Sequence, residues 1–250
     1  MTLQAETSDN NVYDDDLSEI YDQIYTNRAR DYQAEAALLA AIVRARRPEA
    51  ASLLDVACGT AEHLAALKPT FTRLEGLELS AQMRERARAK VPGVQIHEGD
   101  MRRFDLGRTY DAVCCLFNSI SFMATTDELD SAIGSMANHL SPGGVLVIDP
   151  WYSPEQYIEG YVSDSVTRSD GRTIARVSHS AREGRRVRQE AHFVTADSSG
   201  INHFVNVQRL TLFTRDEYAA ALEKAGCAVE LVEGADSLSP DTGTFVGVRR

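Results

Sequence analysis

The chain has 250 residues, of which 43% are hydrophobic and 25% charged, a composition typical of a soluble globular domain with one substantial core. A formal net charge of −11 and a pI near 5.0 exclude a general nucleic-acid or membrane-surface binder, because those partners are themselves anionic. Since no apolar run reaches membrane-spanning length and residues 1–10 lack a signal-peptide pattern, we expect a cytoplasmic protein.

The N-terminal part, residues 1–50, is predicted to form a helical cap on a single domain of residues 1–250. Its first sixteen residues are polar and acidic, and we expect them to be mobile. Apolar and aromatic side chains then recur at helical spacing, and a second helix is predicted over residues 32–47. Two tyrosines of the first helical segment, Tyr21 and Tyr25, either pack it on the core or present hydroxyl groups to a ligand.

A glycine-containing loop follows the first predicted strand, residues 52–56. The second strand ends at Glu78, nineteen residues after Gly59. At about this offset in a βαβ unit, a carboxylate accepts hydrogen bonds from both ribose hydroxyls of a nucleotide-like ligand. Dinucleotide-binding loops use three glycines to seat a pyrophosphate, whereas this loop has one. We therefore expect a ligand with an unphosphorylated ribose and no pyrophosphate.

Strands and helices alternate as far as residue 149, which predicts a doubly wound α/β sheet with its ligand crevice at the carboxyl ends of the strands. After the fourth strand, Asn118 and Ser119 either lie beside the reacting group or simply begin a loop. The predicted strands are residues 52–56, 73–78, 94–97, 110–117 and 145–149, and the predicted helices are residues 62–67, 81–90, 127–140 and 215–225.

Residues 151–213 carry a second pattern, in which period-two alternation is interrupted by glycine-containing turns. We expect an inserted antiparallel β-sheet that serves substrate recognition, dimerisation or both. Its arginines either contact a nucleotide diphosphate or lie on a solvated strand face. They are Arg168, Arg172, Arg176, Arg182, Arg185, Arg186 and Arg188.

Histidines and cysteines give no sign of a metal. The histidines of the predicted inserted strands, His179, His192 and His203, have no zinc spacing with a carboxylate. Two others, His63 and His97, look like surface or element-end residues. The four cysteines also lack metal-ligand spacing, and we expect them to be reduced packing residues.

Three separated motifs resemble, in their order, those of S-adenosylmethionine-dependent methyltransferases: Asp55-x-Ala57-x-Gly59-x-Ala61, Glu78-Leu79-Ser80-x-x-Met83 and Gly99-Asp100-Met101. The resemblance implies a class I methyltransferase fold, Rossmann-like, with a mainly parallel seven-stranded sheet. It also implies that the glycine loop meets the methionine portion, Glu78 the ribose and Asp100 the adenine amino group. Taken singly, Asp55 also suits a helix cap and Asp100 a turn.

The same resemblance implies a set of cofactor contacts. An arginine and a tyrosine near the N-terminus are expected to meet the methionine carboxylate, since a guanidinium offers a fork of donors suited to that group. The expected contacts are Arg30, Tyr32, Asp55, Ala57, Gly59, Glu78, Leu79, Met83, Asp100 and Met101.

A narrower resemblance covers nearly the whole chain after Tyr21. The chain looks like the dTDP-amino-sugar N,N-dimethyltransferases of antibiotic biosynthesis in the runs Tyr21-Asp22-x-x-Tyr25, Asp31-Tyr32-x-x-Glu35-Ala36, Gly99-Asp100-Met101-Arg102, Pro150-Trp151, Ala175-Arg176-Val177-Ser178-His179-Ser180 and Phe245-Val246-Gly247-Val248. This resemblance implies two successive methyl transfers to the amine of a dTDP-linked amino deoxyhexose, with S-adenosylhomocysteine as the product of the cofactor. It also implies a homodimer.

Site roles follow from these expectations. Tyr21 is expected to orient the amine or pass its proton to water, with Asn118 and Ser119 beside the reacting groups. Expected substrate contacts are Tyr25, Trp151, Tyr152, Arg176 and His179. Similar enzymes can carry a histidine after the fourth strand, where this chain reads Ser119-Ile120-Ser121-Phe122-Met123, so a side-chain base there is in doubt.

Two other interpretations stay open. A small-metabolite N- or O-methyltransferase would share every cofactor motif. A non-catalytic, cofactor-binding dimeric scaffold would share them too, and would differ by transferring no methyl group.

Overall fold

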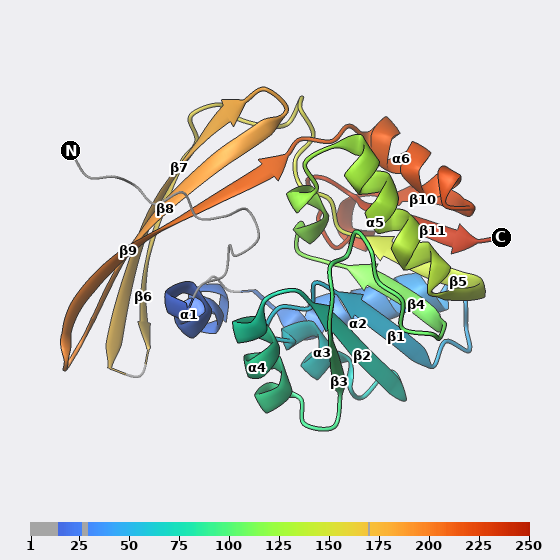
Figure 1. The fold of residues 1–250 in the computed structure, drawn as a ribbon, viewed down its shortest axis with the longest axis horizontal. Helices are drawn as coiled ribbons and strands as arrows, with labels where there is room; N and C mark the ends of the chain where they lie inside the picture. Colours follow the sequence, from blue (N-terminus) through green and yellow to red (C-terminus); the bar gives the residue numbers. More distant parts are fainter. Residues whose placement is uncertain (1–14, 27–29, 170) are drawn as a thin grey trace. The chain divides into compact units, whose positions relative to one another are not determined.

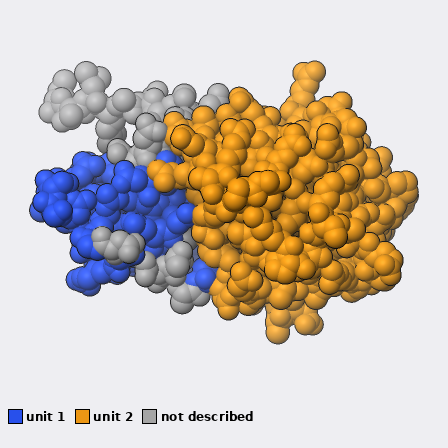
Figure 2. Space-filling view, turned by 90° about the horizontal axis from the view of Figure 1, so that it is seen from below, with its two compact units in different colours: residues 1–30, 158–210 blue, residues 31–157, 211–250 orange. Residues whose placement is uncertain are grey.

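A computed structural model of the protein describes residues 15–26, 30–169 and 171–250. The chain divides into two compact units (Figures 1 and 2), one made of residues 1–30 and 158–210 and the other of residues 31–157 and 211–250. The expected mobile segment, residues 1–16, falls almost wholly outside the described residues. Each unit is described by itself.

The larger unit is built on a seven-stranded sheet, which confirms the predicted fold class. Its strand order is β10-β11-β5-β4-β1-β2-β3, and β11 alone runs antiparallel to its neighbours. The order reverses between β1 and β4, which is where ligands bind in doubly wound sheets. The strands are β1 (Ser52–Val56), β2 (Arg73–Glu78), β3 (Gln95–Glu98), β4 (Tyr110–Cys115), β5 (Leu140–Ile148), β10 (Cys227–Val232) and β11 (Thr244–Arg249).

Helices cover both faces of this sheet (Figure 1). One apolar cluster contains buried side chains of α2 (Tyr32–Arg44), α3 (Glu62–Leu67) and α4 (Ala81–Lys90), and a second contains those of α5 (Thr126–Asn138) and α6 (Arg215–Lys224). Neighbouring strand residues such as Leu53 and Leu54 belong to opposite clusters. Burial on both faces explains why these strands read as continuous apolar runs.

Side chains cap the starts of α2, α4 and α6. Asp31 accepts a hydrogen bond from the backbone N–H of Ala34, and Ser80 accepts one from that of Met83. Thr214 and Glu217 form a reciprocal capping box at the start of α6. Because Ser80 follows Glu78 by two residues, the α4 cap also fixes the turn that leaves β2.

Several predicted boundaries were wrong. The helix expected over residues 32–47 ends at Arg44, and the strand expected over residues 145–149 already begins at Leu140, so residues 141–144 lie inside β5. There the pairing of β4 with β5 shifts register between Tyr110 and Ala112, so a Pro-Gly-Gly run is accommodated within the strand.

The smaller unit is a four-stranded antiparallel sheet in the order β6-β7-β8-β9, with α1 (Asp15–Thr26) packed on one face. Its buried cluster joins three α1 side chains, Leu17, Ile20 and Ile24, to Ile174, Ala191 and Phe193 of the sheet. The strands are β6 (Val162–Ser169), β7 (Arg172–Glu183), β8 (Arg186–Asp197) and β9 (Gly200–Thr211). The sheet was predicted, but its edge strand β6 was not.

None of the helices in the described part of the chain combines the length and apolar character needed to cross a membrane.

Candidate functional site

Left-handed backbone marks the edge of the large sheet where the strand order reverses. Within the described residues, the non-glycine residues with positive φ are Ala57 (60°) and Ala61 (67°) after β1, and Phe117 (55°) and Asn118 (61°) after β4. Each such residue costs about 1–3 kcal/mol, and such strain persists where the surrounding structure enforces it, commonly at functional sites. The open space around the Cα of Gly59 leaves room for a ligand to approach the backbone.

Glu78 sits at this edge as predicted, at the end of β2. One carboxylate oxygen, Oε2, accepts a hydrogen bond from the N–H of Gly59 (2.9 Å), and Oε1 accepts one from the N–H of Ser80 (2.8 Å). Burial raises the pKa of Glu78, and the backbone N–H groups of Ser80 and Gly59 oppose that rise. Each oxygen keeps a further lone pair, so the ionised group can accept both hydroxyls of a ribose.

The turn after Glu78 is held by Arg84, which the sequence analysis missed. Its guanidinium donates to the carbonyl oxygens of Glu78 (3.1 Å) and Leu79 (2.6 Å), and it pairs with Glu98 (2.8 Å). Leu79 is 49% exposed, which makes it available to pack against a flat ring. By contrast, the side chain of Met83 is 1% exposed and packs in the core, and its predicted contact with the cofactor stays a prediction.

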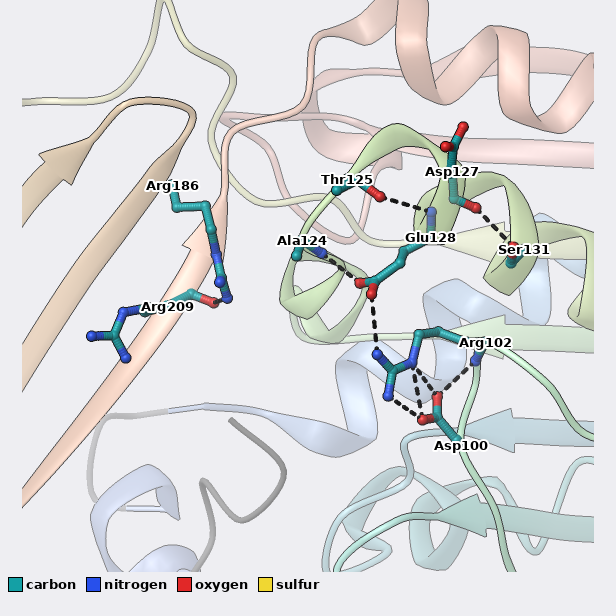
Figure 3. Close-up of polar contacts among 9 residues, drawn as sticks. All are labelled: Asp100, Arg102, Ala124, Thr125, Asp127, Glu128, Ser131, Arg186 and Arg209. Carbon is teal, nitrogen blue, oxygen red and sulfur yellow. Dashed lines mark hydrogen bonds and ion pairs between the residues drawn. The ribbon is translucent and has the colours of Figure 1, made fainter. Parts of the chain in front are cut away.

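Asp100 follows β3, the strand next to β2. Its carboxylate accepts hydrogen bonds from the backbone N–H of Arg102 (2.9 Å) and from the Nε (3.0 Å) and Nη2 (2.5 Å) of the same residue (Figure 3). Partial burial raises the pKa of Asp100, but the contacts with Arg102 outweigh it and the net shift is downward. Asp100 is therefore an ionised acceptor, and the predicted neighbour Met101 packs partly on the core.

Asp55, at the end of β1, is 2% exposed. Its Oδ1 lies 3.6 Å from the Sγ of Cys114, and its Oδ2 is buried with no hydrogen-bond partner among the described residues. Burial raises the pKa of Asp55 to about 6, although the nearby charge of His63 acts to lower it. A buried, unpaired carboxylate oxygen beside the loop suits the ammonium group of an amino-acid ligand.

His63 was expected at the surface or at an element end; it lies at the start of α3 (Glu62–Leu67), but the surface alternative was wrong. It is buried on α3, with Nε2 2.7 Å from the Oε2 of Glu35 and its ring edge-on to Tyr32 at 5.1 Å. Tyr32 thus lies in the larger unit close to the Asp55 loop. Arg30 belongs to the other unit, and its predicted contact with the cofactor stays a prediction.

The segments that follow β4 and β5 bring the predicted acceptor residues to the same edge of the sheet, because parallel strands end together. Asn118 and Ser119 are partly exposed. The N–H of Phe117 donates to the buried Asp149 (2.9 Å), which joins the two strand ends. Trp151 lies 5.8 Å from Tyr152 and 6.2 Å from Tyr157, measured between ring centroids, in an aromatic cluster.

In the smaller unit, the predicted substrate residues Arg176 and His179 lie on opposite faces of β7, because side chains alternate along a strand. Arg176 stacks on Phe193, on the face covered by α1, whereas His179 is exposed on the other face. One ligand on one face of this sheet cannot touch both. Tyr21 is partly buried on α1, and the side chain of Tyr25 lies outside the described residues.

Arg172 and Arg188 form ion pairs with carboxylates of the smaller unit. Arg172 pairs with Glu19 (2.6 Å) and Asp197 (3.3 Å) beside a cavity of about 230 Å³, and Arg188 pairs with Glu190 (2.5 Å). These pairings weaken the diphosphate interpretation for Arg172 and Arg188, since a phosphate would have to displace a carboxylate. Arg168 is exposed and forms no ion pair with the residues that the structure describes, so the interpretation stays a prediction for it.

No group of three or more His, Cys, Asp or Glu side chains able to hold a metal occurs in the described part of the chain. The four cysteines are free and buried, as predicted. Burial raises the pKa of Cys58 and Cys114, so both are neutral packing groups rather than reactive thiolates.

Comparison with known proteins agrees with this geometry. The sequence profile of the family described as "Methyltransferase domain" matches residues 53–144. Over 95% of its length and 99% of the relative's, the chain is 49% identical to the dTDP-3-amino-3,4,6-trideoxy-alpha-D-glucopyranose N,N-dimethyltransferase of Streptomyces venezuelae. Over 98% of its length and 96% of the relative's, it is 46% identical to the dTDP-4-amino-2,3,4,6-tetradeoxy-D-glucose N,N-dimethyltransferase of Saccharopolyspora spinosa.

A solved structure extends the similarity to a protein with cofactor bound. It is CalS10, an amino pentose methyltransferase from Micromonospora echinaspora involved in calicheamicin biosynthesis, with S-adenosylmethionine bound. The TM-score is 0.85 at 47% identity, covering 92% of this chain and 97% of the other.

Proposed function

The chain belongs to the family of S-adenosylmethionine-dependent dTDP-amino-sugar N,N-dimethyltransferases, and we propose that its own acceptor is the amino group of a dTDP-linked amino deoxyhexose. The observation that carries the proposal is the extent of the similarity. At 46–49% identity it covers at least 94% of the chain in three relatives, far beyond the cofactor-binding residues 53–144. A shared cofactor site alone would not extend into the inserted sheet.

When bound, the cofactor supplies an electrophilic methyl group on a sulfonium centre. The acceptor nitrogen forms the new bond to that carbon while the carbon–sulfur bond breaks, and the nitrogen then loses a proton to water before the second round. Holding donor and acceptor in line contributes several kcal/mol to such a reaction. The protein's task is therefore to fix the adenosine at Glu78 and Asp100 and to exclude misaligned acceptors, with Asn118, Ser119, Trp151 and Tyr152 proposed as acceptor contacts.

The test is mass spectrometry of purified protein with S-adenosylmethionine and a panel of dTDP-amino sugars. The names of two relatives place the amine on C3 in one and on C4 in the other, so the panel needs both regioisomers. We expect a mass gain of two methyl groups on at least one sugar. Methylation only of amines or hydroxyls that lack a nucleotide would favour a small-metabolite methyltransferase, and binding of cofactor without any transfer would favour a scaffold.

Tyr21→Phe is expected to lower kcat by about 100-fold or more while leaving the affinity for S-adenosylhomocysteine unchanged. The proposed reason is that the phenol orients the amine or passes its proton to water, a role of the size usual for one positioned proton-transfer group. Steady-state kinetics with the dTDP-amino sugar, alongside calorimetry of cofactor binding, gives both quantities. Wild-type turnover in this variant would remove Tyr21 from the mechanism.

We also propose that the enzyme works in the cytoplasm, which cell fractionation tests.

We propose further that the enzyme is a homodimer. Support for the dimer comes from the sheet face opposite α1, here called the outer valine face: Val162, Val166, Val177, Val194 and Val205. Their exposed fractions range from 38% to 60%. Val166, Ala175 and Val194 lie directly opposite one another on successive strands, so the apolar surface is continuous across them. Contiguous exposed apolar surface of this kind marks interaction sites.

Val177→Asp, at the centre of the outer valine face, is expected to shift the protein from twice the 27.5 kDa chain mass to a monomer in sedimentation or light-scattering measurements. A carboxylate at position 177 would lie directly opposite Asp164 of β6, and two like charges in a buried interface would oppose association. Ile158→Asp changes another exposed apolar residue, outside that face, and should leave the mass unchanged. A wild-type monomer, or a dimeric Val177→Asp, would contradict the proposal.

A further inference from the structure

Arg102 joins the loop after β3 to the start of α5 in the larger unit (Figure 3). Its guanidinium donates to both carboxylate oxygens of Asp100, after β3, through Nε and Nη2. Through Nη1 it pairs with Glu128 of α5 at 3.2 Å. The backbone carbonyl of Arg102 also accepts a hydrogen bond (3.1 Å) from the Oγ of Ser135, which follows Glu128 by seven residues on α5.

Glu128 in turn holds the start of α5. Its Oε2 accepts a hydrogen bond from the N–H of Ala124 (2.8 Å), and its own N–H donates to the Oγ1 of Thr125 (3.2 Å). The carboxylate of Glu128 is therefore fixed by the backbone before it meets Arg102. A fixed carboxylate limits the positions that the guanidinium can take, and so it braces the contact with Asp100.

Stability alone gives a weak reason for this arrangement. The side chains of Asp100, Arg102 and Glu128 are 29%, 38% and 32% exposed, and ion pairs at sites this exposed contribute little to stability. Specificity for the ligand gives a stronger reason for the arrangement. A bidentate guanidinium fixes the plane of a carboxylate, so the lone pairs that remain point in set directions. A carboxylate held in this way attracts a hydrogen-bond donor of the ligand and repels a hydrogen-bond acceptor.

We propose that Arg102, braced by Glu128, is a positioning residue that makes the cofactor site select a 6-amino purine over a 6-oxo purine. This rests on the proposed function, in which Asp100 accepts a hydrogen bond from the adenine amino group. A 6-oxo purine presents an oxygen at that point, next to an ionised carboxylate. Without Arg102, Asp100 can turn away from the oxygen, and the penalty against the 6-oxo ring falls.

The experiment compares the dissociation constants of S-adenosylhomocysteine and S-inosylhomocysteine by calorimetry. Wild-type protein should favour the adenosyl compound by about 100-fold or more, since a site built around a hydrogen bond rejects an analogue that lacks the donor. Arg102→Met should reduce the ratio to below about tenfold, and Glu128→Gln to an intermediate value. Arg103→Met is the matched control, because its side chain is exposed and forms no ion pair with the described part of the chain, and it should keep the wild-type ratio.

The ratio separates positioning from a general loss of structure. If Arg102→Met weakens both compounds equally and keeps the ratio, the inference is overturned although the cofactor site stands. Wild-type protein that binds neither compound would overturn the proposed function and the inference together. If Arg102→Met does not fold, Arg102→Lys tests the inference instead. Lysine keeps the charge but cannot make the two parallel hydrogen bonds, so the ratio of the two dissociation constants should fall below that of Arg103→Met. An unchanged ratio contradicts the inference.

Discussion

Glu78→Ala is expected to weaken the binding of S-adenosylhomocysteine by at least about 100-fold and to leave no turnover at cofactor concentrations that saturate the wild type. Two hydrogen bonds from ribose hydroxyls to a charged acceptor contribute about 1.5–3 kcal/mol each, and 1.4 kcal/mol corresponds to a factor of ten. The substitution also removes the acceptor for the N–H groups of Gly59 and Ser80, which connect the loop after β1 to the turn after β2.

Calorimetry and product analysis measure these effects directly. The matched control is Glu85→Ala on α4, an exposed glutamate that should leave both quantities unchanged. Because burial raises the pKa of Glu78, the affinity of the wild type for S-adenosylhomocysteine should fall as the pH is lowered towards that raised pKa, above the ordinary glutamate value of 4.5. Affinity within threefold of wild type in Glu78→Ala would place the ribose elsewhere.

The position of Glu78 could be predicted because it depends on local features alone: an apolar strand, a fixed offset from Gly59 and a capped helix start. The left-handed backbone of Ala57 and Ala61 could not, since alanine disfavours positive φ and nothing local demands it. There the surrounding sheet and α3 impose the conformation. A motif thus gives the location of the loop, and tertiary packing gives its shape.

Partners distant in sequence explain most of what the sequence analysis missed. The pair Glu35 and His63 is 28 residues apart, and Arg102 and Glu128 are 26 apart, so no spacing rule connects them. A local signal existed for Glu128 alone. Thr125-x-x-Glu128 has the form of a capping box, although the glutamate carboxylate bonds the N–H of Ala124 rather than that of Thr125.

Strand β6 escaped prediction for a different reason. Its two valines, Val162 and Val166, face the exposed side of the sheet, while Ser163, Ser165 and Thr167 face the side of α1. A period-two pattern with serines inward and valines outward is the reverse of the usual one. If the outer valine face is an interface between two copies, the reversal has a physical cause, because both faces are then buried.

Asp55→Asn is expected to raise the melting temperature of the cofactor-free protein at pH 8 while weakening the binding of S-adenosylhomocysteine about tenfold or more. Burial raises the pKa of Asp55 from 3.8 to about 6, so ionising this group disfavours the folded state. That cost is present in full above pH 6, is lost as the pH falls from 6 to 3.8, and is about 3 kcal/mol at pH 8. Burying the asparagine amide retains part of this cost, so Asp55→Asn should raise the free energy of unfolding at pH 8 by about 1–2 kcal/mol.

Thermal unfolding at pH 8 and at pH 5 tests whether Asp55→Asn raises or lowers the melting temperature. A gain of about 1–2 kcal/mol corresponds to roughly 2–8 °C in a chain of this size, and at pH 5 the advantage of Asp55→Asn should shrink to about half or less, because the wild-type carboxyl is then mostly protonated. Asp111→Asn is the control, and it should lower the melting temperature at pH 8 instead of raising it. Asp111 accepts hydrogen bonds from the N–H groups of Ala51 and Ser52, which with other contacts hold its pKa low despite burial, so its loss should destabilise the protein at pH 8. A lower melting temperature for Asp55→Asn at pH 8 would mean that Asp55 stabilises the fold, and that its orphaned oxygen is not held in place for a cationic ligand.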